Sequence, residues 1–286
     1  MSITAPFGTL AGRLFPPAAS AKSASAPIVV WPSLFSTGAV QIRLTELLRA
    51  EGPVLVVDPP GHGASRPLEA TALTLAQTAD ATLSLLEEAG LRGPIRLVGT
   101  SWGGLVGLAI AQQNPEKLAH LALLNTPFER EPSAWNMTRL LPTMARWMGR
   151  SRTFSNGVAR SFFLPQTVSD PTNAEVMAAH HATFQDGDPR AMAAAAIHVF
   201  RTREDVKAWL GNVACDALVI AGRHDPMYDP AMQRNAATAL PNGRFAVVEA
   251  AHIAAVDAPE DVFHILREDW AARTPKPQAQ PNGAIA

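Results

Sequence analysis

Residues 95–104 read IRLVGTSWGG and indicate a strand, a sharp turn and a helix in succession. Residues 95–98, apolar apart from Arg96, are typical of a buried strand, and the residues after the turn predict a helix that ends at Asn114-Pro115. The pattern G-x-S-x-G in this setting is typical of a serine nucleophile. The turn is so sharp that a Cβ at Gly99 or Gly103 would collide with a neighbouring strand or helix. We therefore expect Ser101 at its tip, in a strained conformation with its hydroxyl pointing out of the sheet.

The composition is that of a globular protein with a large core. The chain has 286 residues, of which 47% are hydrophobic and 17% charged, and this suits one large α/β domain with room for an inserted lobe. A net charge of −1 argues against nucleic acid or an anionic membrane as the main partner. The sequence contains neither a long apolar run nor a signal-peptide pattern, so we expect no membrane span and a cytoplasmic location.

The single cysteine, Cys215, excludes an intramolecular disulfide and a thiolate metal cluster, and we expect it in the core before a strand. Apolar runs alternate with helical patterns along much of the chain, and this alternation predicts the α/β class, with a mostly parallel sheet and helices on both faces. Thr74 to Gln77 form a capping box that opens one of these helices. The expected strands are residues 28–31, 53–57, 95–98, 118–125, 217–221 and 244–248, after an edge hairpin within residues 3–15.

The alternation stops at residues 128–213, which are helical in pattern and too long for a loop in a compact domain. We expect a helical lid there, inserted into a core of residues 1–127 and 214–273, and a disordered tail at 274–286. Apolar side chains of the lid are expected to dock it onto the core rather than to line an acyl pocket: Trp135, Met137, Met144, Trp147 and Met148. Its arginines are interpreted as a solvated face: Arg139, Arg146, Arg150, Arg152 and Arg160.

Three polar side chains follow expected strands in the order Ser101, Asp225, His252. Acyl transfer by a serine needs a hydroxyl, a base that takes its proton and a carboxylate that orients the base. The carboxyl ends of parallel strands meet at one edge of a sheet, so these side chains are expected to converge there. The Trp102 N–H, at the start of a helix, suits an oxyanion.

At these residues the chain resembles the α/β-hydrolase superfamily, in its lidded esterase and lactonase branch. The resemblance extends over residues 27–272. Four motifs carry it in the family's order: the nucleophile elbow at 99–104, the D-x-x-G-x-G-x-S turn at 58–65, the acid loop at 222–226, and the base loop at His252 with Pro259-Glu260 behind it. The resemblance implies a catalytic triad of Ser101, Asp225 and His252.

The chain departs from the family pattern after the strand at 28–31. Pro32-Ser33 stands where the family has His-Gly, and a proline has no N–H to donate to an oxyanion. By register with the family, the second oxyanion donor beside Trp102 is the Leu34 N–H, with Ser33 as the alternative. The 3-oxoadipate enol-lactonases are similar here, because they carry Ser-Leu instead of His-Gly. A smaller departure is Ala251, where glycine is common.

Other polar residues have alternative interpretations. Glu129 follows the strand expected at residues 118–125, where some relatives place the acid, and we rank it behind Asp225 as the acid. His62 is expected to brace its turn rather than do chemistry. His180 and His181 lack a third ligand at metal spacing, and adjacent helical side chains point about 100° apart, so one is expected to face the cleft and the other solvent.

The resemblance implies a serine hydrolase of a small ester or lactone that needs no cofactor and no metal, and acts as a monomer or homodimer on a small molecule. Ser101 instead of aspartate argues against haloalkane dehalogenase and epoxide hydrolase chemistry. Carbon–carbon bond hydrolysis and acyl transfer to another acceptor use the same triad and stay open. A small-molecule receptor with this fold and little turnover is the alternative of a different class, because fold does not determine function.

Overall fold

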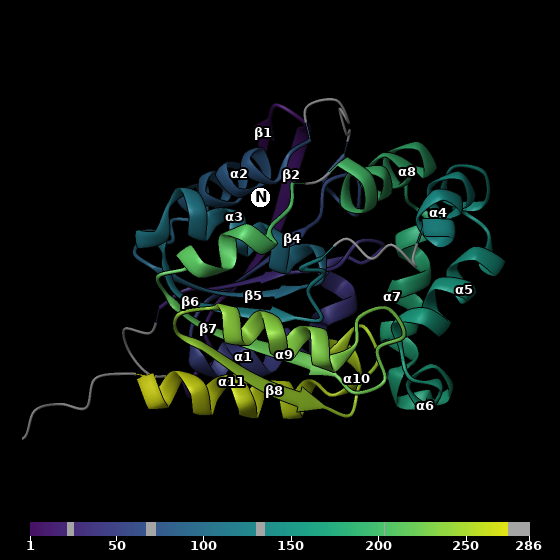
Figure 1. Cartoon of the computed structure of the whole chain (residues 1–286). Helices are drawn as coiled ribbons and strands as arrows, with labels where there is room; N and C mark the ends of the chain where they lie inside the picture. The colour runs from purple at the N-terminus through teal and green to yellow at the C-terminus, as the bar shows by residue number, and fades with distance from the viewer. Residues whose placement is uncertain (22–25, 67–72, 130–134, 203, 274–286) are drawn as a thin grey trace, which may run out of the picture.

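The computed structural model describes residues 1–21, 26–66, 73–129, 135–202 and 204–273, and within residues 135–139 and at 202 only the backbone. The expected disordered tail at 274–286 lies outside these ranges. Figure 1 shows a central sheet with helices on both faces and a separate group of helices at one end.

The sheet has eight strands in the order β1-β2-β4-β3-β5-β6-β7-β8. β1 and β2 form the expected antiparallel edge hairpin, β2 also pairs antiparallel with β4, and all other pairs are parallel. The predicted mostly parallel α/β sheet is therefore confirmed. The strands are β1 (Ser2–Ala5), β2 (Gly8–Phe15), β3 (Ile28–Trp31), β4 (Val54–Asp58), β5 (Ile95–Thr100), β6 (Leu118–Leu124), β7 (Asp216–Gly222) and β8 (Gly243–Val248).

The central strands are apolar on both sides because helices cover both faces of the sheet. All four residues of β3 are buried, and β3 lies between β4 and β5. Trp31 at its end packs edge-on against Trp102, with ring centroids 5.6 Å apart, and its indole N–H donates to Thr82 Oγ1 at 3.0 Å. These contacts fix the end of β3 next to the turn that carries Ser101.

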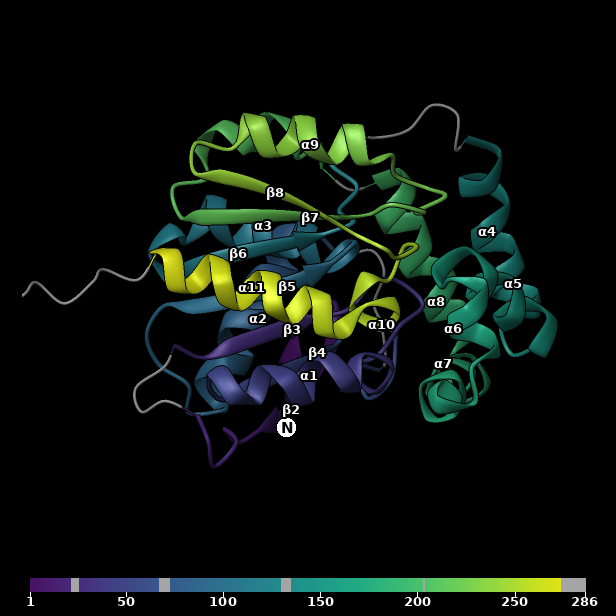
Figure 2. The same cartoon turned by 90° about the horizontal axis from the view of Figure 1, so that it is seen from below.

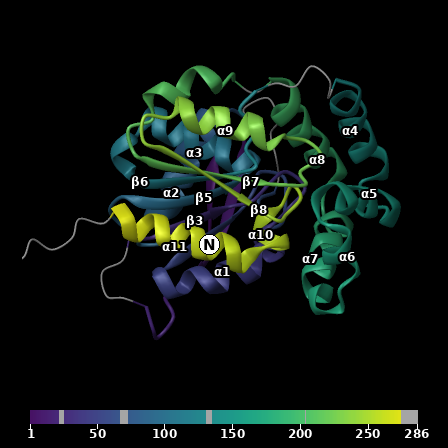
Figure 3. The same cartoon turned by 60° about the horizontal axis from the view of Figure 1, so that its bottom comes forward.

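Figure 1 shows α1 and α11 on one face of the sheet and α2 and α3 on the other, and Figure 3 shows α9 on the side of α3. The capping box is confirmed, because Thr74 Oγ1 accepts from the Gln77 N–H at 3.1 Å and α2 begins at the next residue. The helices are α1 (Ile42–Leu48), α2 (Leu75–Glu88), α3 (Trp102–Gln113), α9 (Pro230–Ala239), α10 (Ala254–Asp257) and α11 (Pro259–Arg273). Short helical turns η1 (Gly38–Gln41) and η2 (Arg49–Glu51) flank α1, and η4 (Pro115–Lys117) precedes β6.

Between β6 and β7 the chain leaves the sheet and forms further helices, here called the inserted helices. Figure 2 shows them gathered at the end of the sheet towards which β8 points. They are α4 (Trp135–Met148), α5 (Arg152–Phe162), α6 (Pro165–Ser169), α7 (Ala174–Gln185) and α8 (Pro189–Ile197), with the shorter turns η5 (Pro171–Asn173) and η6 (His198–Thr202). The turn η7 (Lys207–Asn212) follows them and packs against α3 instead, where Trp209 O accepts from Gln112 Nε2 at 3.1 Å. No helix in the described ranges has the length and apolar character to cross a membrane.

The expected docking of the apolar stripe on α4 is wrong for the side chains that the structure describes. Trp147 is 78% exposed, and Met144 and Met148 are 38% and 39% exposed. The core-facing position on this helix is taken by the small Ala145, which is fully buried. The arginines at 146, 150, 152 and 160 are exposed, as expected of a solvated face, whereas the side chains of Trp135, Met137 and Arg139 lie outside the described part.

Candidate active site

Ser101 lies at the tip of the turn between β5 and α3, in the strained conformation expected there. Its backbone has φ 53° and ψ −110°, and its N–H donates to Leu124 O at 2.8 Å. A Cβ at Gly99 would lie 2.5 Å from the Gly103 backbone, and one at Gly103 would lie 2.0 Å from Trp31 O. Only glycine fits at both positions, so the predicted reason for this turn is confirmed.

Asp225 and His252 form a buried pair across the loops that follow β7 and β8. His252 Nδ1 lies 2.9 Å from Asp225 Oδ2, and the two side chains are 2% and 0% exposed. Burial by itself raises the pKa of the Asp225 carboxyl. The charge of His252 and the hydrogen bonds from His252 and from the Met227 N–H together lower it by more than burial raises it, so the pKa lies below its ordinary value. The carboxylate is therefore charged and accepts the Nδ1 proton, which leaves Nε2 of the imidazole as the basic nitrogen.

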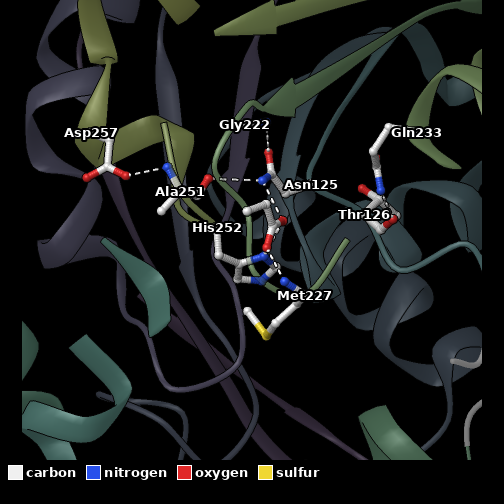
Figure 4. Close-up of polar contacts among 9 residues, drawn as sticks. Asn125, Thr126, Gly222, Met227, Gln233, Ala251, His252 and Asp257 are labelled. Atoms are coloured by element: carbon white, nitrogen blue, oxygen red, sulfur yellow. Dashed lines mark hydrogen bonds and ion pairs between the residues drawn. The ribbon is translucent and has the colours of Figure 1, made fainter. Parts of the chain in front are cut away.

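The structure also identifies a side chain that the sequence interpretation missed. Asn125, the first residue after β6, donates from Nδ2 to Asp225 Oδ2 at 2.7 Å and to Ala251 O at 3.1 Å. Figure 4 shows it between Gly222 and the loop that carries His252. No motif marks this residue. Its only signal is that a polar residue follows directly after an apolar strand at the edge where the other site residues lie.

The loop that carries His252 is also attached to the inserted helices. Asp257 Oδ2 accepts the Ala251 N–H at 2.7 Å, and the same carboxyl accepts the Leu164 N–H, just after α5, at 3.1 Å. The Ile253 N–H donates to Phe162 O at 3.0 Å. Burial raises the pKa of the Asp257 carboxyl above its ordinary value, although the hydrogen bonds it accepts act in the opposite direction.

Two aromatic rings flank the imidazole. The ring centroid of Phe162 lies 5.3 Å from that of His252, and the Tyr228 ring lies 5.5 Å from it. These apolar faces exclude water from the imidazole and restrict its rotation.

The alternative acid, Glu129, forms an ion pair elsewhere. Its Oε1 lies 2.6 Å from Lys207 Nζ, on a part of the surface where both side chains are about half exposed. The Nδ1 of His252 is already hydrogen-bonded to Asp225. The geometry therefore favours Asp225 over Glu129 as the acid.

The loop after β3 is braced by His62. Its Nε2 accepts the Phe35 N–H at 3.1 Å, and its Nδ1 lies 3.0 Å from Pro60 O. Burial lowers the pKa of His62 to about 4, so the ring is neutral and can donate through one nitrogen while it accepts through the other. This is the bracing role expected of it. The Phe35 amide is thereby occupied, and the preceding amides of Ser33 and Leu34 are the two candidates for an oxyanion donor.

The expectation that one of His180 and His181 faces solvent is wrong. The two residues are 0% and 6% exposed, and both contact Ser155 of α5: His180 Nε2 lies 3.0 Å from its carbonyl oxygen and His181 Nδ1 2.8 Å from its Oγ. Both histidine side chains are buried because α5 packs along α7. In the described ranges no three His, Cys, Asp or Glu side chains are grouped to hold a metal ion.

Comparison with known proteins gives related sequences and folds. A family model described as the alpha/beta hydrolase fold matches residues 26–259. The pimeloyl-(acyl-carrier protein) methyl ester esterase of Chromobacterium violaceum is 26% identical over 234 residues, which cover 81% of this chain and 89% of the esterase.

Two solved structures superpose over nearly the whole chain. A thermophilic esterase from Thermogutta terrifontis does so with a TM-score of 0.80 and 25% identity, covering 95% of this chain and 97% of the esterase. The enol-lactonase of Burkholderia xenovorans LB400 gives a TM-score of 0.81 at 22% identity and covers 95% of this chain and 100% of the lactonase, a likeness of fold. Because the family model extends from just before β3 to the first residue of α11, the chain belongs to the α/β hydrolase family, and the protein is a hydrolase.

Proposed function

We propose that the protein is a serine hydrolase that cleaves a small carboxylic ester or lactone. The observation that carries the proposal is the buried Asp225–His252 pair, at the same edge of the sheet as the strained turn of Ser101. Such a turn can present a serine hydroxyl to a substrate carbonyl, and an oriented imidazole can remove its proton.

In the proposed mechanism, His252 Nε2 takes the proton of Ser101 Oγ as that oxygen attacks the substrate carbonyl carbon. The N–H groups of Trp102 and Leu34 stabilise the negative charge on the carbonyl oxygen, with Ser33 as the alternative to Leu34. The imidazolium then protonates the leaving alkoxide, and the acyl group stays on Ser101. Water, deprotonated by His252, attacks this ester, and the imidazolium returns that proton to Ser101 Oγ as the acid is released, while Asp225 stabilises the imidazolium in both steps.

The inserted helices are proposed to act as a lid over this site. Support comes from their position at the end of the sheet and from the hydrogen bonds that join Phe162 and Leu164 to the loop of His252. A lid of this kind determines which acyl and alcohol groups fit. The esterases among the similar proteins favour an ester bond. Carbon–carbon bond hydrolysis and acyl transfer remain alternatives, because they use the same triad.

A fluorophosphonate probe followed by mass spectrometry tests the nucleophile. We expect one adduct, on Ser101, because only an activated serine attacks this phosphorus centre. Ser101→Ala should abolish labelling and lower kcat by several orders of magnitude, with a residual rate from the oxyanion donors and binding. Ser169→Ala, on α6, is the matched control and should label normally. An adduct elsewhere, or none on a preparation that hydrolyses aryl esters or lactones, would refute the assignment.

A further inference from the structure

Asn125 occupies a strained position beside the loops that carry Asp225 and His252. It follows β6 directly, is fully buried, and has a φ of 46°, in the left-handed region that asparagine tolerates better than most residues. Its own N–H donates to Ile220 O of β7 at 3.0 Å. The backbone is thus held to the neighbouring strand, and the side chain is directed at the loops beyond the sheet.

Every hydrogen-bonding group of the Asn125 side-chain amide has a partner in one of those loops or at the end of β7. Nδ2 donates to Asp225 Oδ2 at 2.7 Å and to Ala251 O at 3.1 Å, and Oδ1 accepts the Gly222 N–H at 3.1 Å. Figure 4 shows the bond to Gly222 as a dashed line from the amide oxygen and the bond to Ala251 as a dashed line from the amide nitrogen. One side chain therefore contacts the acid, the residue before the base and the end of the strand that leads to the acid.

The chemistry of these partners determines the orientation of the amide. If the amide were turned over, its oxygen would face the carboxylate of Asp225 and the carbonyl of Ala251, and its NH₂ group would face the N–H of Gly222. All three contacts would be repulsive, so only the orientation described is stable. An aspartate here would face the same repulsion from the first two groups unless it carried a proton.

We propose that Asn125 is a positioning residue that fixes the acid and the base of the triad in their positions relative to each other. Its catalytic consequence rests on the proposed function, whereas the arrangement itself does not. Asp225 Oδ2 accepts from both Asn125 and His252, while Oδ1 accepts the Met227 N–H at 2.8 Å. The carboxylate is therefore fixed at both oxygens.

The base is fixed through its neighbour. Ala251, which precedes His252, has its carbonyl bound by Asn125 and its N–H bound by Asp257. Gly222 permits this approach, because a Cβ there would lie 2.2 Å from Ala251 O. Removal of the Asn125 amide would leave Ala251 O without this donor and leave Asp225 Oδ2 with His252 as its single remaining partner among these contacts.

Asn125→Ala is expected to lower kcat by about 10- to 100-fold and to leave KM within a few-fold, because a displaced acid and base impair the chemical step and not substrate binding. Gln233→Ala is the matched control. Gln233 is another fully buried amide, which donates to Thr126 O at 2.8 Å, next to Asn125, and Figure 4 shows this pair apart from His252. The control should lose stability to a similar extent and keep its kcat.

Asn125→Asp separates positioning from a merely structural role. Its carboxyl would lie against Asp225, so the two would share one proton at low pH, and the protonated Asn125→Asp side chain could still donate to Asp225. As the pH rises, that proton leaves and the two charges repel each other. The kcat/KM profile of Asn125→Asp should therefore gain a fall on the alkaline side that the native protein and Gln233→Ala lack.

Crystal structures of the native protein and of Asn125→Ala test the arrangement without any substrate. We expect the 2.9 Å contact between His252 Nδ1 and Asp225 Oδ2 to lengthen or to split into two conformers in the variant. If that contact is unchanged, or if both Asn125 variants keep the native kcat and pH profile, the inference is overturned. A native protein that hydrolyses neither esters nor lactones would refute the proposed function, and the structural comparison would still decide this inference.

Discussion

Among the described residues, backbone strain in residues other than glycine occurs at Phe35, Ser101 and Asn125, each with a positive φ. They follow β3, β5 and β6, which are neighbours in the sheet, and all three lie at its carboxyl edge. Such conformations persist only where the surroundings hold them, and they concentrate at functional sites. Here the neighbours are His62 at Phe35, the flanking glycines at Ser101, and the loops of the acid and base at Asn125.

The identity of the acid can be tested at the level of single residues. Asp225→Asn should nearly abolish turnover, because an amide in place of the carboxylate favours the wrong tautomer of His252, which in the template triad costs about 10⁴ in kcat. Glu129→Gln should stay within a few-fold, since Glu129 pairs with Lys207. Steady-state kinetics on one substrate suffice. The reverse pattern would move the acid to Glu129, and comparable partial losses would contradict both assignments.

At the scale of elements, α11 is fastened to the sheet by a buried carboxylate. Asp269, 2% exposed, lies 2.6 Å from His120 Nε2 of β6 and 2.8 Å from Arg244 of β8. Burial by itself raises the pKa of this carboxyl, but the hydrogen bond from His120 and the neighbouring charges lower it overall. Because the folded-state pKa is depressed, the stabilisation is fully present above the unfolded-state value and is lost as the pH falls through the folded-state value.

Asp269→Asn should therefore lower the free energy of unfolding at pH 7 by about 3 kcal/mol, the size expected when one partner of a buried pair is removed. The difference from the native protein should shrink once the pH falls below about 4, where the unfolded carboxyl is protonated. Urea denaturation at several pH values measures both. Asp80→Asn on α2 is an exposed control. A difference that is independent of pH would contradict this account.

The exposure of the apolar stripe on α4 has its own consequence. Trp147→Ala should change the free energy of unfolding by less than about 0.5 kcal/mol, because the indole is already 78% exposed. Phe184→Ala on α7, where the ring is fully buried, should cost about 3 to 5 kcal/mol. Thermal denaturation of the two variants makes the comparison. A large loss from Trp147→Ala would mean that this ring packs on the core after all.

At the scale of the whole molecule, the inserted helices and the core meet at the loop that carries His252. Asp257 joins the end of α5 to the loop of His252 through two backbone N–H groups, from Leu164 and Ala251. Asp257→Ala should leave both amides without their acceptor and speed their hydrogen–deuterium exchange, while α2 and α3 keep native rates. Asp261→Ala, an exposed neighbour on α11, is the control. Unchanged exchange at Leu164 would show that other contacts hold this junction.

Much of this fold could be predicted from the sequence because its signals are local. The apolar runs, the capping box at Thr74 and the glycines around Ser101 each act within a few residues, and the structure contains each of them. The alternation of strands and helices implied that Ser101, Asp225 and His252 would reach one edge of the sheet. The structure brings Asp225 and His252 into contact, and the role of Ser101 remains a prediction.

Only the tertiary structure decided which distant side chains meet. Asn125 and Asp225 are 100 residues apart, and their hydrogen bond exists because β6 and β7 are adjacent in the sheet. The burial of both His180 and His181 likewise depends on where α5 packs, and the exposure of Trp147 depends on which side of α4 faces the core. Residue type and periodicity determine that a helix has an apolar side, but the packing of one element against another determines which side chains are covered.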